Sequence, residues 1–334
     1  MPRISVLMSV YNDAKYVNEG LESILSQTLS EFEVIIVDDG STDGTDDVLK
    51  EVKDPRVTLI RREHSGLAAS LNYGLGIAQG EFIARQDADD VSCPSRFSLE
   101  VRALEGNPSL GVVGTGVTLV DEAGLELGHR VYPASHAQIR EWLLNGRNPL
   151  VHSSLMFRRS AMNAMGGYDA HFVKSEDYDL HLRLSACWSI ATIPEPLLRL
   201  RYRLDSLQAS GGGFSEGMKY SLFARFLEEC RCQGIVPSEG LWPEFFPIYE
   251  KWYKTQKDLT KSANSTAALR RARIWLECHD YVRCFEEILK IGCADPLTLM
   301  RKTFRQDSSG WGKARLAELL ALYVQWETGT GGHG

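Results

Sequence analysis

The chain has 334 residues, more than one domain usually holds, so two domains are expected. Hydrophobic residues make up 43% and charged residues 24% of the sequence, which is typical of a globular protein with a buried core. The net charge of -7 excludes general nucleic-acid binding, which needs a basic surface, and an anionic substrate would need a local cation or helix N-termini.

The N-terminus and the cysteines favour a cytoplasmic protein. A strand-like run begins directly after residues 1–3, so no signal peptide is expected, and no apolar run reaches the length of a membrane span. The seven cysteines form no closely spaced framework and are expected to be reduced. A peripheral position at the inner face of a membrane is left open.

Four short apolar runs separated by helix-like stretches predict an α/β fold. Strand–helix–strand units of this kind place their strands parallel. The glycines within residues 74–80 have the wrong spacing for a dinucleotide fingerprint and lie at the end of a predicted helix. The apolar runs cover residues 4–10, 32–37, 57–60 and 81–85.

Polar side chains follow the first two runs at their carboxyl ends, where open parallel sheets bind ligands. Asp38 and Asp39 suit recognition of the hydrogen-bond donors of a nucleobase or ribose, and Tyr11 suits contact with the face of a base. The alternative for the two aspartates is an ordinary turn.

The fourth run delivers the segment Asp87-Ala88-Asp89-Asp90 to the same edge. Residues two apart in an extended segment share one face, so Asp87 and Asp89 could hold one hard divalent cation. Taken alone, the segment is better explained as a solvated Asp-rich turn. Its place beside Tyr11 and Asp38 favours a cation between the phosphates of a nucleotide; no chemistry is assigned to Asp90.

Several stretches together resemble family 2 glycosyltransferases of the GT-A fold. They are residues 5–12, 37–44, 72–75, 78–85 and the DADD segment itself. The resemblance covers about the first two thirds of the chain. It implies a doubly wound mixed sheet with a Rossmann-like nucleotide-binding half, a sugar-nucleotide donor and an inverting reaction.

The resemblance also implies roles for single residues. Asp87 and Asp89 would hold Mg or Mn against the diphosphate, and an aspartate of the first acidic pair would contact the base. Contacts to the nucleotide are expected from the motif residues Ser9, Tyr11, Asn12, Asp38, Asp39, Asn72, Arg85, Asp87 and Ala88.

A second acidic pair, Glu176-Asp177, opens a predicted helix. Acidic residues in a first helical turn are commonly partners of the helix dipole. The resemblance instead identifies an ED motif, in which Asp177 is the catalytic base that takes the proton of an acceptor hydroxyl. Glu176 would be its neighbour or a substrate contact.

Four further residues are candidates for acceptor or phosphate contacts. His152 lies in a stretch that resembles the family pattern, although a lone histidine is more often structural. Arg201 and Arg203 either close over the diphosphate or lie on the surface. Relatives often carry histidine where this chain has Asp205, which could bind a metal but would not neutralise phosphate.

The C-terminal third has a helical pattern after a glycine-rich linker at residues 209–213. We predict a GT-A domain over residues 1–210 and a small all-helical domain over 211–334, with a disordered tail at 329–334. The helical domain could pack on the catalytic domain, form a homodimer, dock a partner or contact a lipid-linked acceptor.

The predicted function is a metal-dependent, inverting hexosyltransferase. It would move a sugar from a UDP- or dTDP-sugar to a hydroxyl of a glycan or lipid-linked acceptor, in bacterial surface polysaccharide synthesis. One alternative is a glycoside hydrolase with a carboxylate pair, which would not need the strand-end aspartates or a metal. The other is a non-catalytic module that binds nucleotide sugars, which the intact DxD and ED motifs argue against.

Overall fold

The computed structural model describes residues 2–203 and 213–232. The chain divides into two compact units, residues 1–221 and 222–334. The linker at 209–213 falls largely outside the described residues. Asp205, the predicted helices beyond residue 232 and the tail at 329–334 also lie outside them.

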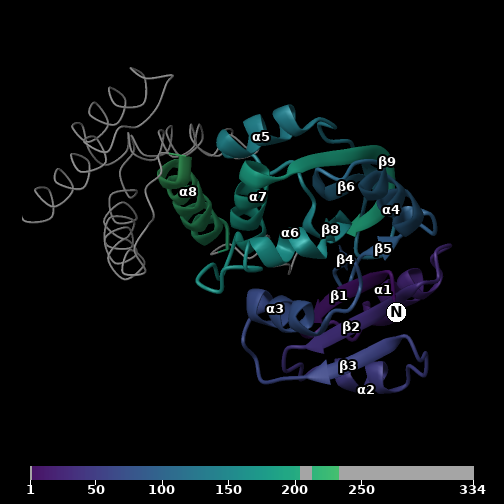
Figure 1. Cartoon of the computed structure of the whole chain (residues 1–334). Coiled ribbons are helices and arrows are strands. Elements are labelled where there is room, and N and C mark those ends of the chain that lie inside the picture. The colour runs from purple at the N-terminus through teal and green to yellow at the C-terminus, as the bar shows by residue number, and fades with distance from the viewer. Residues whose placement is uncertain (1, 204–212, 233–334) are drawn as a thin grey trace, which may run out of the picture. The chain divides into compact units, whose positions relative to one another are not determined.

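Four parallel strands form the first half of the sheet, in the order β3-β2-β1-β4 (Figure 1). This confirms the predicted parallel α/β half. The chain moves from β1 outward to β2 and β3 and then returns to the other side of β1, and ligands bind open sheets at such a reversal. The elements of this half are β1 (Ile4–Val10), α1 (Val17–Leu25), β2 (Phe32–Asp38), α2 (Thr45–Lys50), β3 (Val57–Arg61), α3 (Leu67–Ile77) and β4 (Phe82–Arg85).

Helices cover both faces of these strands, as in a doubly wound sheet. Val6 and Met8 of β1 belong to the core cluster that also includes apolar residues of α1 and α2. Leu7 points to the opposite face and packs against α3. A Cβ added to Gly74 of α3 would lie 3.2 Å from Cδ2 of Leu7. Burial on both faces explains why the strands appear in the sequence as continuous apolar runs.

The second half makes the sheet mixed. β8 pairs antiparallel with β4, β6 pairs antiparallel with β8, and β9 runs parallel to β6. β5 lies at the far edge, and β7 forms an antiparallel hairpin with β6. The elements are β5 (Val91–Ser92), α4 (Arg96–Gly106), β6 (Leu110–Val120), β7 (Glu126–Arg130), α5 (His136–Leu144), η1 (His152–Ser154), β8 (Met156–Arg158), α6 (Arg159–Ala164), α7 (Glu176–Cys187), β9 (Ser189–Arg201) and α8 (Gly213–Cys232).

The sequence pattern predicts a helix over residues 94–104, with Pro94 in its first turn, and a strand over residues 190–193, and one boundary of each differs from the structure. The helix expected from Pro94 begins at Arg96, because the Pro94 carbonyl accepts a hydrogen bond from Thr28 N (2.9 Å) and belongs to the preceding loop. The strand expected over residues 190–193 continues to Arg201. Register shifts against β6 let the strand pass through two prolines.

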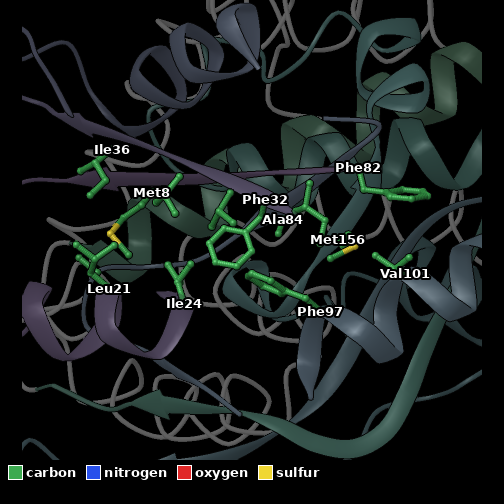
Figure 2. Packing of buried hydrophobic residues seen from close by; sticks show 14 of the residues in the cluster. Met8, Leu21, Ile24, Phe32, Ile36, Phe82, Ala84, Phe97, Val101 and Met156 are labelled. Carbon is green, nitrogen blue, oxygen red and sulfur yellow. The ribbon is translucent and has the colours of Figure 1, made fainter. Parts of the chain in front are cut away.

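The main core lies between the sheet and helices α1 and α4 (Figure 2). Phe32 of β2 meets Phe97 of α4 edge to face, with ring centroids 5.9 Å apart. Met8, Leu21, Ile24, Ile36, Phe82, Ala84, Val101 and Met156 surround them. Within residues 2–203 and 213–232, no helix is both long and apolar enough to cross a membrane.

Candidate active site

The predicted aromatic contact, Tyr11, lies exposed just beyond β1. Its side chain is 47% exposed, and its ring centroid lies 4.4 Å from that of His64, with the two planes tilted by 31°. His64 follows β3, so two strand ends supply one aromatic surface. A surface of this kind can stack against the flat face of a base.

Asp38 and Asp39 have different surroundings. Asp39 accepts hydrogen bonds from Gly66 N (2.9 Å), Ser65 N (2.9 Å) and Ser70 Oγ (2.8 Å). Burial favours a higher pKa for this carboxyl, but the hydrogen bonds outweigh it and the pKa is lowered. Asp39 therefore fixes the loop that carries His64.

Asp38 is fully buried and keeps one free acceptor. Its Oδ1 accepts from Ser41 N (2.9 Å), whereas Oδ2 has no hydrogen-bond partner and lies 3.8 Å from Arg61 Nε. Of the two aspartates, Asp38 is the one with a carboxylate oxygen left for a donor group.

Three other predicted nucleotide contacts lie in the scaffold of this edge. Asn12, with φ of 56°, donates its backbone N–H to Ser41 Oγ and accepts from Thr42 N, so it joins the β1 and β2 loops. Asn72 of α3 donates to the Tyr168 carbonyl (2.7 Å) and accepts from the Tyr168 N–H (2.9 Å). Ser9 is a half-buried β1 residue.

The DADD turn is built on a buried arginine. Arg85, 1% exposed, donates from Nη2 to Asp87 Oδ1 (2.5 Å), while its Nε and Nη1 have no hydrogen-bond partner. Ala88 is buried against α1. Its carbonyl approaches Gly20 of that helix closely, which is possible because glycine has no side chain there. The turn therefore lies tightly on the first helix.

Arg203 places a cation beside Asp89. It forms ion pairs with Asp89 Oδ2 (3.3 Å) and with Asp13, and its guanidinium lies over the Tyr16 ring. Burial and the nearby charges of Asp87 and Asp13 raise the pKa of Asp89 to about 6, against the opposing effect of Arg203. The site therefore holds more negative charge than its arginines balance.

Arg201 is buried, and its guanidinium is held by an ion pair and hydrogen bonds within the protein. It therefore neither lies on the surface nor is available to close over a ligand. Its side chain is 3% exposed, pairs with Glu19 Oε2 (2.6 Å) and donates from Nε to the Asp89 carbonyl (2.9 Å). The guanidinium also lies 4.7 Å from the centre of the Tyr16 ring.

Asp90 links three parts of the site. It accepts hydrogen bonds from Ser153 Oγ of η1 and from the Arg201 N–H of β9 (2.9 Å). Burial and the charges of Asp87 and Asp89 raise its pKa well above the ordinary value. The third carboxylate of the turn thus connects β4, η1 and β9.

Asp87 and Asp89 suit a divalent ion that also binds a diphosphate. The described residues contain no group of three or more His, Cys, Asp or Glu side chains that could hold a metal. Two carboxylates leave coordination positions for phosphate oxygens and water, as Mg²⁺ prefers. The raised pKa of Asp89 marks an excess of negative charge that such a cation would relieve.

The second acidic pair begins α7, directly after Ser175, whose φ is 60°. Asp177 accepts from Asn148 Nδ2 (3.0 Å) and from Tyr178 N (2.7 Å). Burial raises the pKa of Asp177 to about 6 and, with the Asp177 charge, that of Glu176 to about 8. Asp177 is therefore ionised at neutral pH and able to accept a proton.

His152 lies against tyrosine and histidine rings. Its Nε2 is 2.8 Å from the Tyr168 hydroxyl, and its ring centroid is 6.3 Å from that of His181. Burial, Arg85 and His181 lower its pKa well below the ordinary value, so the ring is neutral. Asp205, the last of the predicted contacts, lies outside the described residues.

The Glycosyl transferase family 2 model matches residues 5–166. The O-antigen biosynthesis glycosyltransferase WbnJ of Escherichia coli is 37% identical over 227 residues, which cover 66% of this chain and 87% of WbnJ. The chain belongs to glycosyltransferase family 2.

The chain is also similar to a second glycosyltransferase in sequence and to a solved structure in fold. Putative glycosyltransferase EpsE of Bacillus subtilis is 39% identical over 188 residues, 54% of this chain and 66% of EpsE. The crystal structure of S. aureus TarS 1-349 in complex with UDP-GlcNAc covers 86% of this chain and 90% of its own, with a TM-score of 0.56 and 16% identity. This likeness shows the GT-A type of fold. WbnJ is named for O-antigen biosynthesis, and a further relative, AmsE of Erwinia amylovora, for amylovoran biosynthesis.

Three residues of this family 2 site were not assigned by sequence reasoning: Asp13, His64 as a ring partner, and Asn148. Asp13 and Asn148 contact residues 190 and 29 positions away in the chain. Two signals were available: His64 follows the third apolar run at a strand end, where it could meet phosphate or be solvated, and Asn148 lies at the start of the stretch that resembles the family pattern.

Proposed function

We propose that this family 2 enzyme transfers a hexose from a UDP- or dTDP-sugar to a hydroxyl of a glycan or lipid-linked acceptor, with inversion. The observation that carries the proposal is the position of Arg85 between the two acidic motifs. Arg85 pairs with Asp87, and its charge also opposes the rise that burial causes in the pKa values of Asp177 and Glu176. The residues assigned to the diphosphate and to the base therefore lie within electrostatic reach of one another.

The donor side would be organised by three groups. The aromatic surface of Tyr11 and His64 would lie against the base, and the free Asp38 oxygen would accept from a donor group of the nucleoside. Asp87 and Asp89 would hold Mg or Mn. The bound ion would offset the charge of the departing nucleoside diphosphate.

The acceptor side would depend on Asp177. Its carboxylate takes the proton of the acceptor hydroxyl as the new bond forms from that oxygen to the anomeric carbon. The bond between the anomeric carbon and the phosphate oxygen breaks, and the nucleoside diphosphate leaves with the electron pair. Attack from the face opposite the leaving group gives inversion.

Three considerations support the finer assignment. The TarS structure carries UDP-GlcNAc, so a related fold accepts a UDP-sugar. Family membership favours transfer over the alternative of a glycoside hydrolase, and the pair Glu176-Asp177 is intact, which disfavours a non-catalytic module. A lipid-linked acceptor would place the enzyme at the inner face of a membrane.

The proposal is tested with a panel of UDP- and dTDP-sugars in the presence of Mn²⁺. We expect one donor to release its nucleoside diphosphate, and the Asp177→Asn variant to bind UDP as the wild type does while losing at least a hundredfold in turnover. Asp54→Asn, which alters an ion pair with Arg56, is the matched control and should retain activity. Full turnover by Asp177→Asn would remove Asp177 as the base.

A further inference from the structure

One turn of α7 after Asp177 lies a fully buried histidine. His181 has no exposed surface, and its Nε2 has no hydrogen-bond partner. Residues four apart in a helix share one face. Asp177 and His181 use that shared face to contact the same side chain, Asn148.

The orientation of the Asn148 amide follows from a backbone donor. The Leu150 N–H lies 3.2 Å from Asn148 Oδ1, and a backbone N–H can only donate. The oxygen of the amide therefore faces Leu150, and its nitrogen faces Asp177 Oδ2 at 3.0 Å. Asn148 donates to the carboxylate.

The same oxygen determines the tautomer of His181. Its Nδ1 lies 3.1 Å from Asn148 Oδ1, which can only accept, so Nδ1 carries the proton. Burial and Arg183 lower the pKa of His181 to about 3, so the ring is neutral and Nε2 is bare. His181 and Leu150 together prevent the amide from turning over.

Several charged groups act on Asp177 from the elements around it. Arg85 and the Tyr178 N–H favour the ionised carboxylate, whereas burial and the charge of Asp87 oppose it, and Glu176 is its acidic neighbour. His152 and His181 are neutral. Among the side chains, Asn148 supplies the direct hydrogen bond to Asp177 Oδ2.

We propose that Asn148 is a positioning residue for the base, held by His181 so that its amide N–H aims and stabilises the Asp177 carboxylate. The inference rests on the proposed function, because it takes Asp177 as the base. Asn148 does not itself contact the reacting atoms in this role. A hydrogen bond to the charged form of a carboxyl makes it a weaker base but keeps it ionised at neutral pH.

The direct test is the titration of Asp177 by NMR in the full chain, labelled with ¹³C at the aspartate carboxyls. The spectrum of Asp177→Asn assigns the signal. We expect the Asp177 pKa to rise by about one unit in Asn148→Ala, since the ionised form loses a donor. His181→Phe keeps a ring but leaves the Asn148 amide free to turn, so it should cause a smaller rise of the Asp177 pKa. It is the variant to titrate if Asn148→Ala does not fold.

Turnover provides the second measurement, with release of UDP from the UDP-sugar that the wild type uses. In Asn148→Ala we expect about a twofold loss of turnover at pH 7, because about half of the Asp177 carboxyls are then protonated, together with an acid limb moved about one unit to higher pH and unchanged stabilisation by UDP. Asn145→Ala is the matched control, because its amide donates to the Glu141 carbonyl on α5, and it should titrate and turn over as the wild type does.

An Asp177 titration that is unchanged in both Asn148→Ala and His181→Phe would overturn the inference. This outcome is separate from a failure of the proposed function, which would appear as full turnover by Asp177→Asn whatever the titration shows.

Discussion

The carbonyl oxygen of Ala88, in the middle of the DADD turn, lies so close to Gly20 of α1 that a Cβ added to Gly20 would be only 2.3 Å from it. The obstructing atoms are backbone, so a side chain there must displace the helix or the turn. Gly20→Ala should therefore lower the free energy of unfolding by about 1–3 kcal/mol, the usual range for overpacking. It should also weaken the stabilisation of the protein by UDP.

Thermal unfolding with and without UDP measures both effects. Gly76→Ala is the control, since a Cβ at this position of α3 meets nothing within 4 Å. The control should unfold at or slightly above the wild-type temperature, because alanine favours helix. Equal behaviour of the two variants would contradict the tight contact between α1 and the turn.

Glu100 should make the protein less stable as pH rises from about 4.5 to about 7. Burial raises its pKa from 4.5 to about 7, against the effect of Arg96. The folded chain thus keeps a proton that the unfolded chain releases, so the free energy of unfolding falls through this window, by up to roughly 3 kcal/mol. Glu100→Gln should flatten the pH dependence and be the more stable form at pH 8.

Denaturant unfolding at pH 5 and pH 8 checks this expectation. The exposed Glu141→Gln on α5 is the control and should leave the pH dependence unchanged. A Glu100→Gln variant whose stability falls with pH as steeply as the wild type would show that the buried carboxyl is not the cause.

If Asp87 and Asp89 hold the proposed divalent ion, its removal should abolish the binding of UDP. Asp87, Asp89 and Asp13 together carry more negative charge than Arg85 and Arg203 balance, and a diphosphate adds to it. We expect UDP to raise the unfolding temperature with Mn²⁺ and to have little effect with EDTA. Asp89→Asn should lose the effect of Mn²⁺, whereas Asp54→Asn should keep it. An Asp89→Asn variant that responds to Mn²⁺ and UDP like the wild type would place the ion elsewhere.

The pH profile of turnover should show an acid limb near pH 6, where Asp177 takes up a proton. Below it the rate should fall about tenfold per pH unit. Arg85→Met removes a cation that favours the ionised form, so the limb should move to higher pH, whereas Arg85→Lys should move it less. A limb that stays in place in Arg85→Met would show that Arg85 does not act on the base.

The inner strands of the parallel half, β1, β2 and β4, could be predicted because they are buried on both faces. Burial of that kind leaves an uninterrupted apolar run, and the polar residue that ends it marks the edge where ligands bind open sheets, as Asp38 does at the end of β2. The continuation of β9 could not be predicted, because it depends on register shifts against β6 that accommodate Pro194 and Pro196.

In the site, motifs located the acidic groups but not the division of roles among them. Asp38 and Asp39 are adjacent in sequence, yet the Asp39 carboxylate anchors the loop at Ser65, 26 residues later. Arg201 and Arg203 look alike in sequence, but Arg201 lies beneath the DADD turn while Arg203 pairs with Asp89. Such differences arise from contacts between distant segments, which no local pattern records.

Asn72 meets the backbone of Tyr168 as a neighbouring strand would, donating to its carbonyl and accepting from its N–H. A Cβ on Gly167 would collide with the same amide oxygen, at 2.5 Å. One junction between the first and second halves of the sheet is thus made by a side chain and a turn that have to match. Chimeric enzymes that exchange the second half between relatives should therefore work best when the asparagine and the glycine come from the same relative, which constrains where recombination can cut.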